Sequence, residues 1–237
     1  MLNEGATPNI VGFVVEETGR LTVVEGSART LPSGAVGDPA QIAFNPTGKT
    51  LVVTEKETNL IVTWRVRVDG LLQAPVITSS NGITPFGFGF DSLGHLIVSE
   101  AAAGVAEASS VSTYRFLPGG VPESVSVSIP DFQTTAGWVV VTLDDRFVYT
   151  SNTGSGQVSS YSLQTDGSIS LLDGAASNTS ALSRPIDLAL SRDGVNLYVH
   201  QAGTKAIAVF EINPDGSLNK RNRTLGLPIG AQGIAAH

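Results

Sequence analysis

The sequence contains no cysteine, and this absence excludes several kinds of chemistry at once. Disulfide bonds, thiolate catalysis and cysteine-ligated metal sites cannot form. Basic residues are also few, because 14 Lys and Arg stand against 21 Asp and Glu, which gives a formal net charge of −7. The densest basic run, Lys220-Arg221-Asn222-Arg223, is expected to be a solvated loop. Nucleic-acid binding is therefore not expected, since neutralising phosphates requires a basic surface.

Long apolar runs are missing as well, although 41% of the residues are hydrophobic. No run approaches the ~20 residues that a membrane span requires, so no membrane association is expected. Met1 is followed by Leu-Asn-Glu-Gly, without the basic segment and apolar core of a signal peptide. These features predict a cytoplasmic protein, or an exported one if the true N-terminus lies upstream of Met1.

What the sequence has in abundance is short apolar runs separated by turn residues. The stretch Pro39–Ser80 contains four such runs, rich in Val, Ile, Leu and Thr and each too short for an ordinary helix. This pattern predicts a four-stranded antiparallel meander, with strands A to D in chain order.

The meander recurs along the chain with a period near fifty. The turns between strands A and B begin at Asn45, Asp91, Thr142 and Ser191, which are 46, 51 and 49 residues apart. One aromatic residue marks each C strand: Phe13, Trp64, Tyr114, Tyr161 and Phe210. Four strands per repeat at this period are typical of a β-propeller, an all-β fold of four-stranded antiparallel blades. A β-sandwich is the alternative, but it would not require an aromatic residue at the same phase five times.

The repeats divide the chain into one propeller domain, residues 1–237, of about five blades. A partial blade covers 1–38, and full blades cover about 39–85, 86–135, 136–185 and 186–230. The segment 231–237 resembles a further A strand, so we expect it to complete the blade whose C strand is Asn9–Glu16. The closing blade would then be shared between the termini. An open arc that associates with a second copy through this incomplete blade is the alternative.

Candidate site residues lie where the strands meet one mouth of the central channel. The ends of the B strands carry Glu55, Glu100, Asn152 and Gln201, with His200 beside the last. Two carboxylates facing one cavity can act as general acid and base or bind a divalent cation through oxygen ligands. No other cofactor is expected. The competing interpretation is that these residues are ordinary rim groups that cap strand ends.

The starts of the A strands supply a second set of candidates: Gln41, Phe86, Trp138, Asp187 and Gln232. Phe86 and Trp138 could form an aromatic platform for a sugar, or simply pack between blades. His95 lies in a turn between strands A and B, on the opposite face, and is expected to be a surface residue. His237 is terminal.

Several stretches resemble the β-propeller lactonase family, which contains bacterial 6-phosphogluconolactonase and fungal carboxymuconate cyclase. They are residues 39–59 (PAQIAFNPTGKTLVVTEKETN), 84–101 (TPFGFGFDSLGHLIVSEA), 138–156 (WVVVTLDDRFVYTSNTGSG) and 187–204 (DLALSRDGVNLYVHQAGT). The resemblance implies seven blades, of which the first two would be missing here. It also implies a site built from His and Arg near A-strand starts and Glu at a B-strand end. Glu55 and Glu100 match that pattern. The His and Arg pair does not, because no His or Arg occupies an A-strand start and Arg184 lies just upstream, in a loop.

Three functional hypotheses remain open from the sequence. The first is a lactone hydrolase, in which Glu55 or Glu100 activates water against a sugar lactone or related cyclic ester. The second is a non-catalytic scaffold that recognises a protein or glycan through the same rim. The third is an incomplete propeller that assembles only with another copy.

Overall fold

The structure is a computed structural model that describes residues 1–236; His237 lies outside the described residues. Four sheets of four antiparallel strands follow one another along the chain. Their strands are β6 (Pro39–Phe44), β7 (Thr50–Glu55), β8 (Leu60–Arg65) and β9 (Val76–Ser79); β10 (Pro85–Phe90), β11 (Leu96–Glu100), β12 (Ser110–Leu117) and β13 (Val121–Pro130); β14 (Ala136–Val141), β15 (Phe147–Asn152), β16 (Gln157–Leu163) and β17 (Ile169–Asp173); β18 (Pro185–Leu190), β19 (Asn196–Gln201), β20 (Ala206–Ile212) and β21 (Leu218–Leu225).

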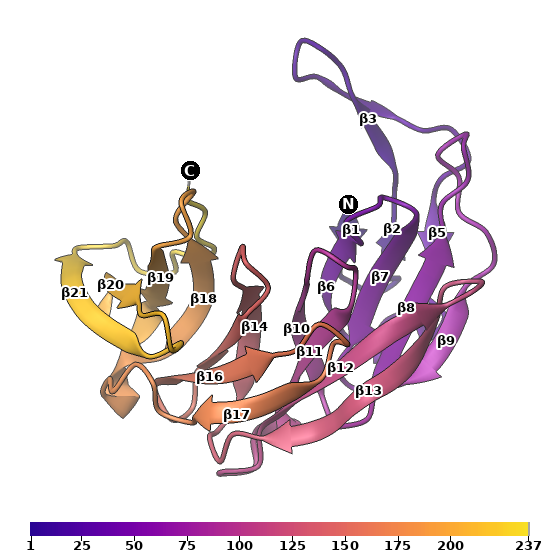
Figure 1. Ribbon diagram of the computed structural model, residues 1–237. Helices are drawn as coiled ribbons and strands as arrows, with labels where there is room; N and C mark the ends of the chain where they lie inside the picture. Colours follow the sequence, from indigo (N-terminus) through magenta and orange to yellow (C-terminus); the bar gives the residue numbers. More distant parts are fainter. Residues whose placement is uncertain (237) are drawn as a thin grey trace.

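The sheets are arranged radially around an open arc (Figure 1). Their first strands contact one another in order, β6 with β10, β10 with β14 and β14 with β18, and so form the inner side of the arc. Short 3₁₀ turns, η1 (Gly34–Val36), η2 (Ala102–Gly104), η3 (Ala181–Ser183) and η4 (Ala202–Thr204), occupy connecting loops. The predicted all-β propeller of four-stranded blades is therefore confirmed. No helix in residues 1–236 is long and apolar enough to cross a membrane.

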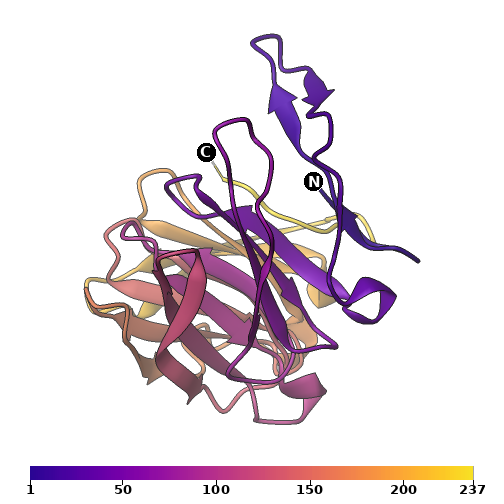
Figure 2. The same cartoon turned by 90° about the vertical axis from the view of Figure 1, so that its right-hand side faces the viewer.

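The N-terminal unit is smaller and is split in two. Strands β1 (Leu2–Asn3), β2 (Asn9–Ile10) and β5 (Arg29–Thr30) form one small sheet, and β3 (Phe13–Val15) pairs with β4 (Leu21–Val23). The predicted single strand over 9–16 is interrupted at Gly12, whose N–H binds the Ser27 hydroxyl (3.0 Å) instead of continuing the ladder. The β3–β4 hairpin consequently stands away from the body of the protein (Figure 2).

Each of the first three four-stranded sheets packs both of its faces against neighbouring parts of the structure. On β7, Val53 belongs to a core cluster with Ile10 of the N-terminal unit, whereas the adjacent Val52 joins a cluster with Phe88 of the next sheet. Further clusters lie between the second and third sheets, around Val139, and between the third and fourth, around Leu188. Successive side chains of a strand point to opposite faces, so near-continuous apolar strands are what this arrangement requires.

The predicted aromatic positions are confirmed in the four full blades. Trp64, Tyr114, Tyr161 and Phe210 are each at most 1% exposed. Phe13 differs: it is only partly buried, because it lies on the projecting hairpin rather than between two sheets.

The predicted closing strand is not formed. Residues 231–236 contain no strand, and they lie beside β18 at the opposite end of the arc from the N-terminal unit (Figure 1). The Ile234 N–H donates to Asp187 Oδ2 (2.8 Å), as the Phe88 N–H donates to Gln41 Oε1 (2.9 Å) at the interface between the first two sheets. The segment thus occupies the place of the next A strand but has no B strand with which to pair.

Burial of the aromatic residues predicts how their replacement changes the free energy of unfolding. We expect Tyr161→Ala to lower the free energy of unfolding by about 3–5 kcal/mol, because it leaves a cavity between two sheets. Tyr161→Phe should change it little, since the Tyr161 hydroxyl has no hydrogen-bond partner among the described residues. Urea denaturation of both variants, with Phe13→Ala as the exposed control, measures this. Equal losses at positions 13 and 161 would contradict the assigned packing.

Candidate functional site

The loops at one end of the sheets repeat the same backbone geometry four times. The residue before each A strand has a left-handed conformation, with φ of 46° at Asp38, 59° at Thr84, 60° at Thr135 and 46° at Arg184. Its carbonyl accepts a hydrogen bond from the residue after the B strand, namely Lys56, Ala101, Thr153 or Ala202. We call the surface built by these eight residues the loop face. Left-handed non-glycine residues are strained and often mark functional sites, so this face is the first place to look for one.

Glu100 occupies the end of β11 and is completely buried. Its Oε1 accepts hydrogen bonds from the Ser112 hydroxyl (2.6 Å) and the Gly82 N–H (2.8 Å), and its Oε2 accepts one from the Ser110 hydroxyl (2.5 Å). A Cβ at Gly82 would lie 2.1 Å from Oε2, so only glycine allows this approach. Glu100 therefore holds the preceding loop against its own sheet.

Glu55 has the same place at the end of β7 and is equally buried, but its carboxylate is less well satisfied. Oε2 accepts hydrogen bonds from the Ser33 hydroxyl and from the Thr58 hydroxyl (2.9 Å). Oε1 has no partner among the described residues. The difference comes from the neighbouring strand, because Leu60 and Val62 stand where the sheet of Glu100 has Ser110 and Ser112.

The structure does not join Glu55 to Glu100. The two carboxylates bind different loops, and no hydrogen bond connects them in the described part of the chain. Residues 1–236 also contain no group of three or more His, Asp or Glu arranged to hold a metal ion. The catalytic role of these residues and the divalent cation between them stay predictions.

Asn152 and Gln201 complete the ring of buried B-strand ends, at 0% and 3% exposed. Asn152 Nδ2 donates to the Ser159 hydroxyl (2.7 Å), which donates to Asp131 Oδ2 (2.9 Å). Sequence reasoning missed Asp131. Its signal in the sequence is a single carboxylate in the loop before the third blade, whose B strand ends in Asn152 rather than in Glu.

At the A-strand starts, the pairing register corrects one alignment. Gln41, Trp138 and Asp187 stand at the same phase, but the matching residue of the second sheet is Gly87, one position after Phe86. A Cβ at Gly87 would lie 2.4 Å from the Trp138 ring, so Gly87 makes room for the tryptophan. Gln232 is likewise one position early, since Ile234 is the residue bound by Asp187.

An aromatic pair lies on the second and third A strands, β10 and β14. The rings of Phe86 and Trp138 are 5.1 Å apart and both are partly exposed. The Lys56 ammonium lies 5.3 Å from the centre of the Phe86 ring and 2.9 Å from Asp38 Oδ2. The loop face thus offers a planar apolar surface beside a paired ammonium and carboxylate, which suits a ligand with one apolar ring face and polar edges.

Asp187 and His200 form a second polar pair, on paired positions of β18 and β19. Burial raises the pKa of the Asp187 carboxyl, against the opposing effects of the Leu188 and Ile234 N–H groups and of His200. His200 is 3% exposed, and its Nδ1 has no hydrogen-bond partner in residues 1–236.

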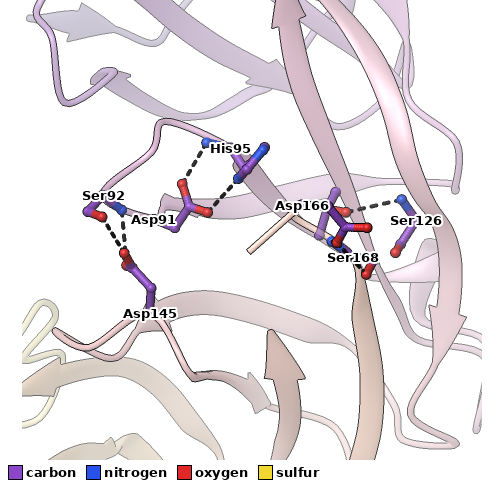
Figure 3. Close-up of polar contacts among 8 residues, drawn as sticks. Asp91, Ser92, His95, Ser126, Asp145, Asp166 and Ser168 are labelled. Carbon is purple, nitrogen blue, oxygen red and sulfur yellow. Dashed lines mark hydrogen bonds and ion pairs between the residues drawn. The ribbon is translucent and has the colours of Figure 1, made fainter. Parts of the chain in front are cut away.

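His95 lies in the turn between β10 and β11, as predicted, where its side chain points toward Asp91 (Figure 3). This turn is at the opposite end of the sheets from the loop face. His95 is not a free surface residue, because only 14% of its side chain is exposed. Asp91 binds both its N–H (2.7 Å) and its Nδ1 (2.6 Å), and a Cβ at Gly167 would lie 2.7 Å from the ring. We interpret this pair as a turn-stabilising contact.

The comparisons with known proteins agree with this architecture. The sequence matches the family described as Lactonase, 7-bladed beta-propeller, over residues 7–118 and 108–230, so the chain belongs to that family. A search of curated proteins finds no match.

Solved structures show the same fold at low sequence identity. A protein from Bacteroides uniformis assigned as a 6-phosphogluconolactonase has a TM-score of 0.76 at 21% identity, and the alignment covers 95% of this chain and 67% of that one. The periplasmic gluconolactonase of Pseudomonas aeruginosa has a TM-score of 0.73 at 17% identity, with 96% and 67% covered. A Lactobacillus plantarum protein has a TM-score of 0.75 at 16% identity, with 94% and 66% covered. The chain spans about two thirds of the length of these proteins.

The buried carboxyl of Asp131 predicts how the stability of the folded protein depends on pH. Burial raises the pKa of Asp131, against hydrogen bonds from Gln133 and Ser159. The folded state therefore keeps its proton at a pH where the unfolded chain, with an ordinary carboxyl pKa, has lost it. Between those two pKa values, stability falls as pH rises, and the loss persists above them.

Asp131→Asn removes this penalty. Its Oδ1 still accepts from the Gln133 N–H, and its Nδ2 can donate to the Ser159 hydroxyl, which accepts in place of donating. We expect the free energy of unfolding of the variant, relative to the parent, to increase from acid to neutral pH. Urea denaturation across that range measures it, with exposed Asp69→Asn as the control. A difference between variant and parent that stays constant with pH would refute the assigned shift.

Proposed function

We propose that the chain binds a sugar lactone or a related cyclic ester at the loop face and opens its ring by hydrolysis. Membership of the lactonase family supports the reaction class. The observation that carries the assignment is the unpartnered oxygen of Glu55, since an unsatisfied buried carboxylate oxygen is costly and calls for a hydrogen-bond donor such as a water molecule.

The aromatic pair provides the binding surface in this proposal. A sugar ring has one face of C–H groups, which packs on Phe86 and Trp138, and hydroxyl edges that reach Lys56 and Asp38. Lys56 directly follows Glu55 in the chain, so the platform and the carboxylate belong to the same corner of the loop face.

In the reaction, Glu55 takes a proton from water as the water oxygen attacks the lactone carbonyl carbon. The bond between that carbon and the ring oxygen then breaks, and the ring oxygen takes the proton back from Glu55, which gives the hydroxy acid and restores the carboxylate. Lys56 would polarise the carbonyl as negative charge develops on it. Because Glu55 has no exposed surface, the segment holding Ser33 and η1 must move before water reaches it. Its residues Ala35 and Val36 are exposed, which leaves room for that movement.

Complete burial of both Glu55 and Glu100 favours the second candidate, a propeller that binds its ligand without turning it over. In that case Glu55 would only anchor the 33–37 loop, as Glu100 anchors the 80–82 loop. The same aromatic surface would then recognise a glycan or sugar-like ligand.

Glu100 provides a matched control for Glu55, because the two residues share position and burial but differ in their partners. We expect Glu55→Gln to lower kcat for glucono-δ-lactone opening by about 10²–10⁴-fold, the usual contribution of a general base. Glu100→Gln should lower the melting temperature with little change in kcat. Trp138→Ala should raise KM.

The measurement is a pH-stat assay of ring opening, with each variant's melting curve recorded alongside. Equal rates for the parent and Glu55→Gln would remove the hydrolase proposal. If lactone still protected the parent against thermal unfolding but not the Trp138→Ala variant, the non-catalytic binding function would stand.

A further inference from the structure

The last blade contains a pocket with a charge unlike the rest of the protein. Its volume is about 230 Å³, and it lies between the start of β18, the loop after β19 and the segment after β21. Three of its lining side chains are Arg184, His200 and Lys205, and no Asp or Glu among the described residues lines it. In a chain of net charge −7, such a grouping of basic side chains is not a general property of the surface.

Both exposed cations are fixed by their backbone. Arg184 and Lys205 have left-handed φ values of 46° and 52°. The Arg184 carbonyl accepts from Ala202 N–H (3.1 Å), and the Lys205 carbonyl accepts from the N–H groups of Gly226 and Leu227 (both 3.1 Å). These bonds tie together three separate segments of the chain around the pocket, so the strained conformations are held in place.

Gly203 shapes the same wall. A Cβ there would lie 2.2 Å from the Leu182 carbonyl oxygen and 3.1 Å from Arg184 Cγ. The aliphatic part of the Arg184 side chain therefore packs against Gly203, where only glycine fits. Arg184 also lines the pocket.

The basic groups lack partners of their own. Neither Arg184 nor Lys205 makes an ion pair within residues 1–236, although most other arginines of the chain do. His200 is 3% exposed and its Nδ1 has no partner in the same range. The nearby carboxylate of Asp187 is already bound by the N–H groups of Leu188 and Ile234, each at 2.8 Å.

We propose that this pocket is an anion-binding site for a phosphate or carboxylate group. A guanidinium binds either group through two parallel hydrogen bonds, an ammonium adds a point charge, and an imidazole nitrogen can donate a third bond. The volume is below the ~300–1,000 Å³ of pockets that enclose drug-sized ligands, so the site takes a small anion or the charged end of a larger molecule. It is separate from the Phe86–Trp138 surface and does not depend on lactone chemistry.

Calorimetric titration of the whole chain with inorganic phosphate, and separately with acetate, tests the site at constant ionic strength. We expect saturable binding of at least one anion and a matching rise in melting temperature by mass action. Arg184→Gln should weaken binding about tenfold or more, and Arg184→Lys should recover part of it. Lys220→Gln, on exposed strand β21, is the control and should bind as the parent does.

Preference for phosphate or for acetate identifies which group the site takes, and either result supports it. Absence of saturable binding by both anions would overturn the proposal, as would equal weakening in Arg184→Gln and Lys220→Gln, which would indicate only general charge attraction. If Arg184→Gln does not fold, Lys205→Gln replaces it with the same expected loss.

Discussion

The structure depends on one constraint: a four-stranded sheet whose two faces are both apolar must be covered on both sides. Val52 and Val53, adjacent on β7, are each fully buried but in different core clusters, one with each neighbouring sheet. The radial order of the sheets follows, because each interface satisfies one face of two sheets at once. The same constraint explains the ends of the arc, where Ile234 and its neighbours lie over β18–β21 and Phe13 lies on a hairpin with one side uncovered.

The radial packing also buries the ends of the B strands, and there the sequence places polar residues. The side chains of Glu55 and Glu100 bind the loops that precede their sheets, so the shape of this part of the loop face depends on buried hydrogen bonds. Such groups are costly when unpaired, which makes the unequal satisfaction of Glu55 and Glu100 informative. Family membership alone would treat these two residues as equivalent. Their neighbours on the adjoining strand distinguish them.

Much of this architecture could be predicted from the sequence because it is local and repeated. The turn spacing and the aromatic positions gave the blades, and Trp64, Tyr114, Tyr161 and Phe210 lie where the period predicted. The uncertain parts depended on pairing. A β-bulge near the start of each A strand shifts the pairing register by one residue. Aligning the repeats by sequence alone could not detect this shift, and it therefore placed Phe86 instead of Gly87 at the position equivalent to Gln41.

The sequence predicts some of the polar contacts of the site but not others. Ser110 and Ser112 against Leu60 and Val62 can be found in the sequence once the strands are paired, and they account for the different partners of Glu100 and Glu55. The gathering of Arg184, His200 and Lys205 could not be predicted in the same way. It depends on how the segment after β21 folds back over the loop after β19, and no repeat specifies that path.

The central claim is that the corner of the loop face around Glu55, Phe86 and Trp138 receives the ligand. A crystal structure of the chain with a lactam analogue, which has a lactone's shape but resists hydrolysis, tests it most directly. The account predicts the analogue's ring against Phe86 and Trp138, its carbonyl towards Lys56, and the Ser33 loop displaced so that Glu55 Oε1 gains a partner. An analogue bound elsewhere, with the Ser33–Glu55 hydrogen bond intact, would contradict it.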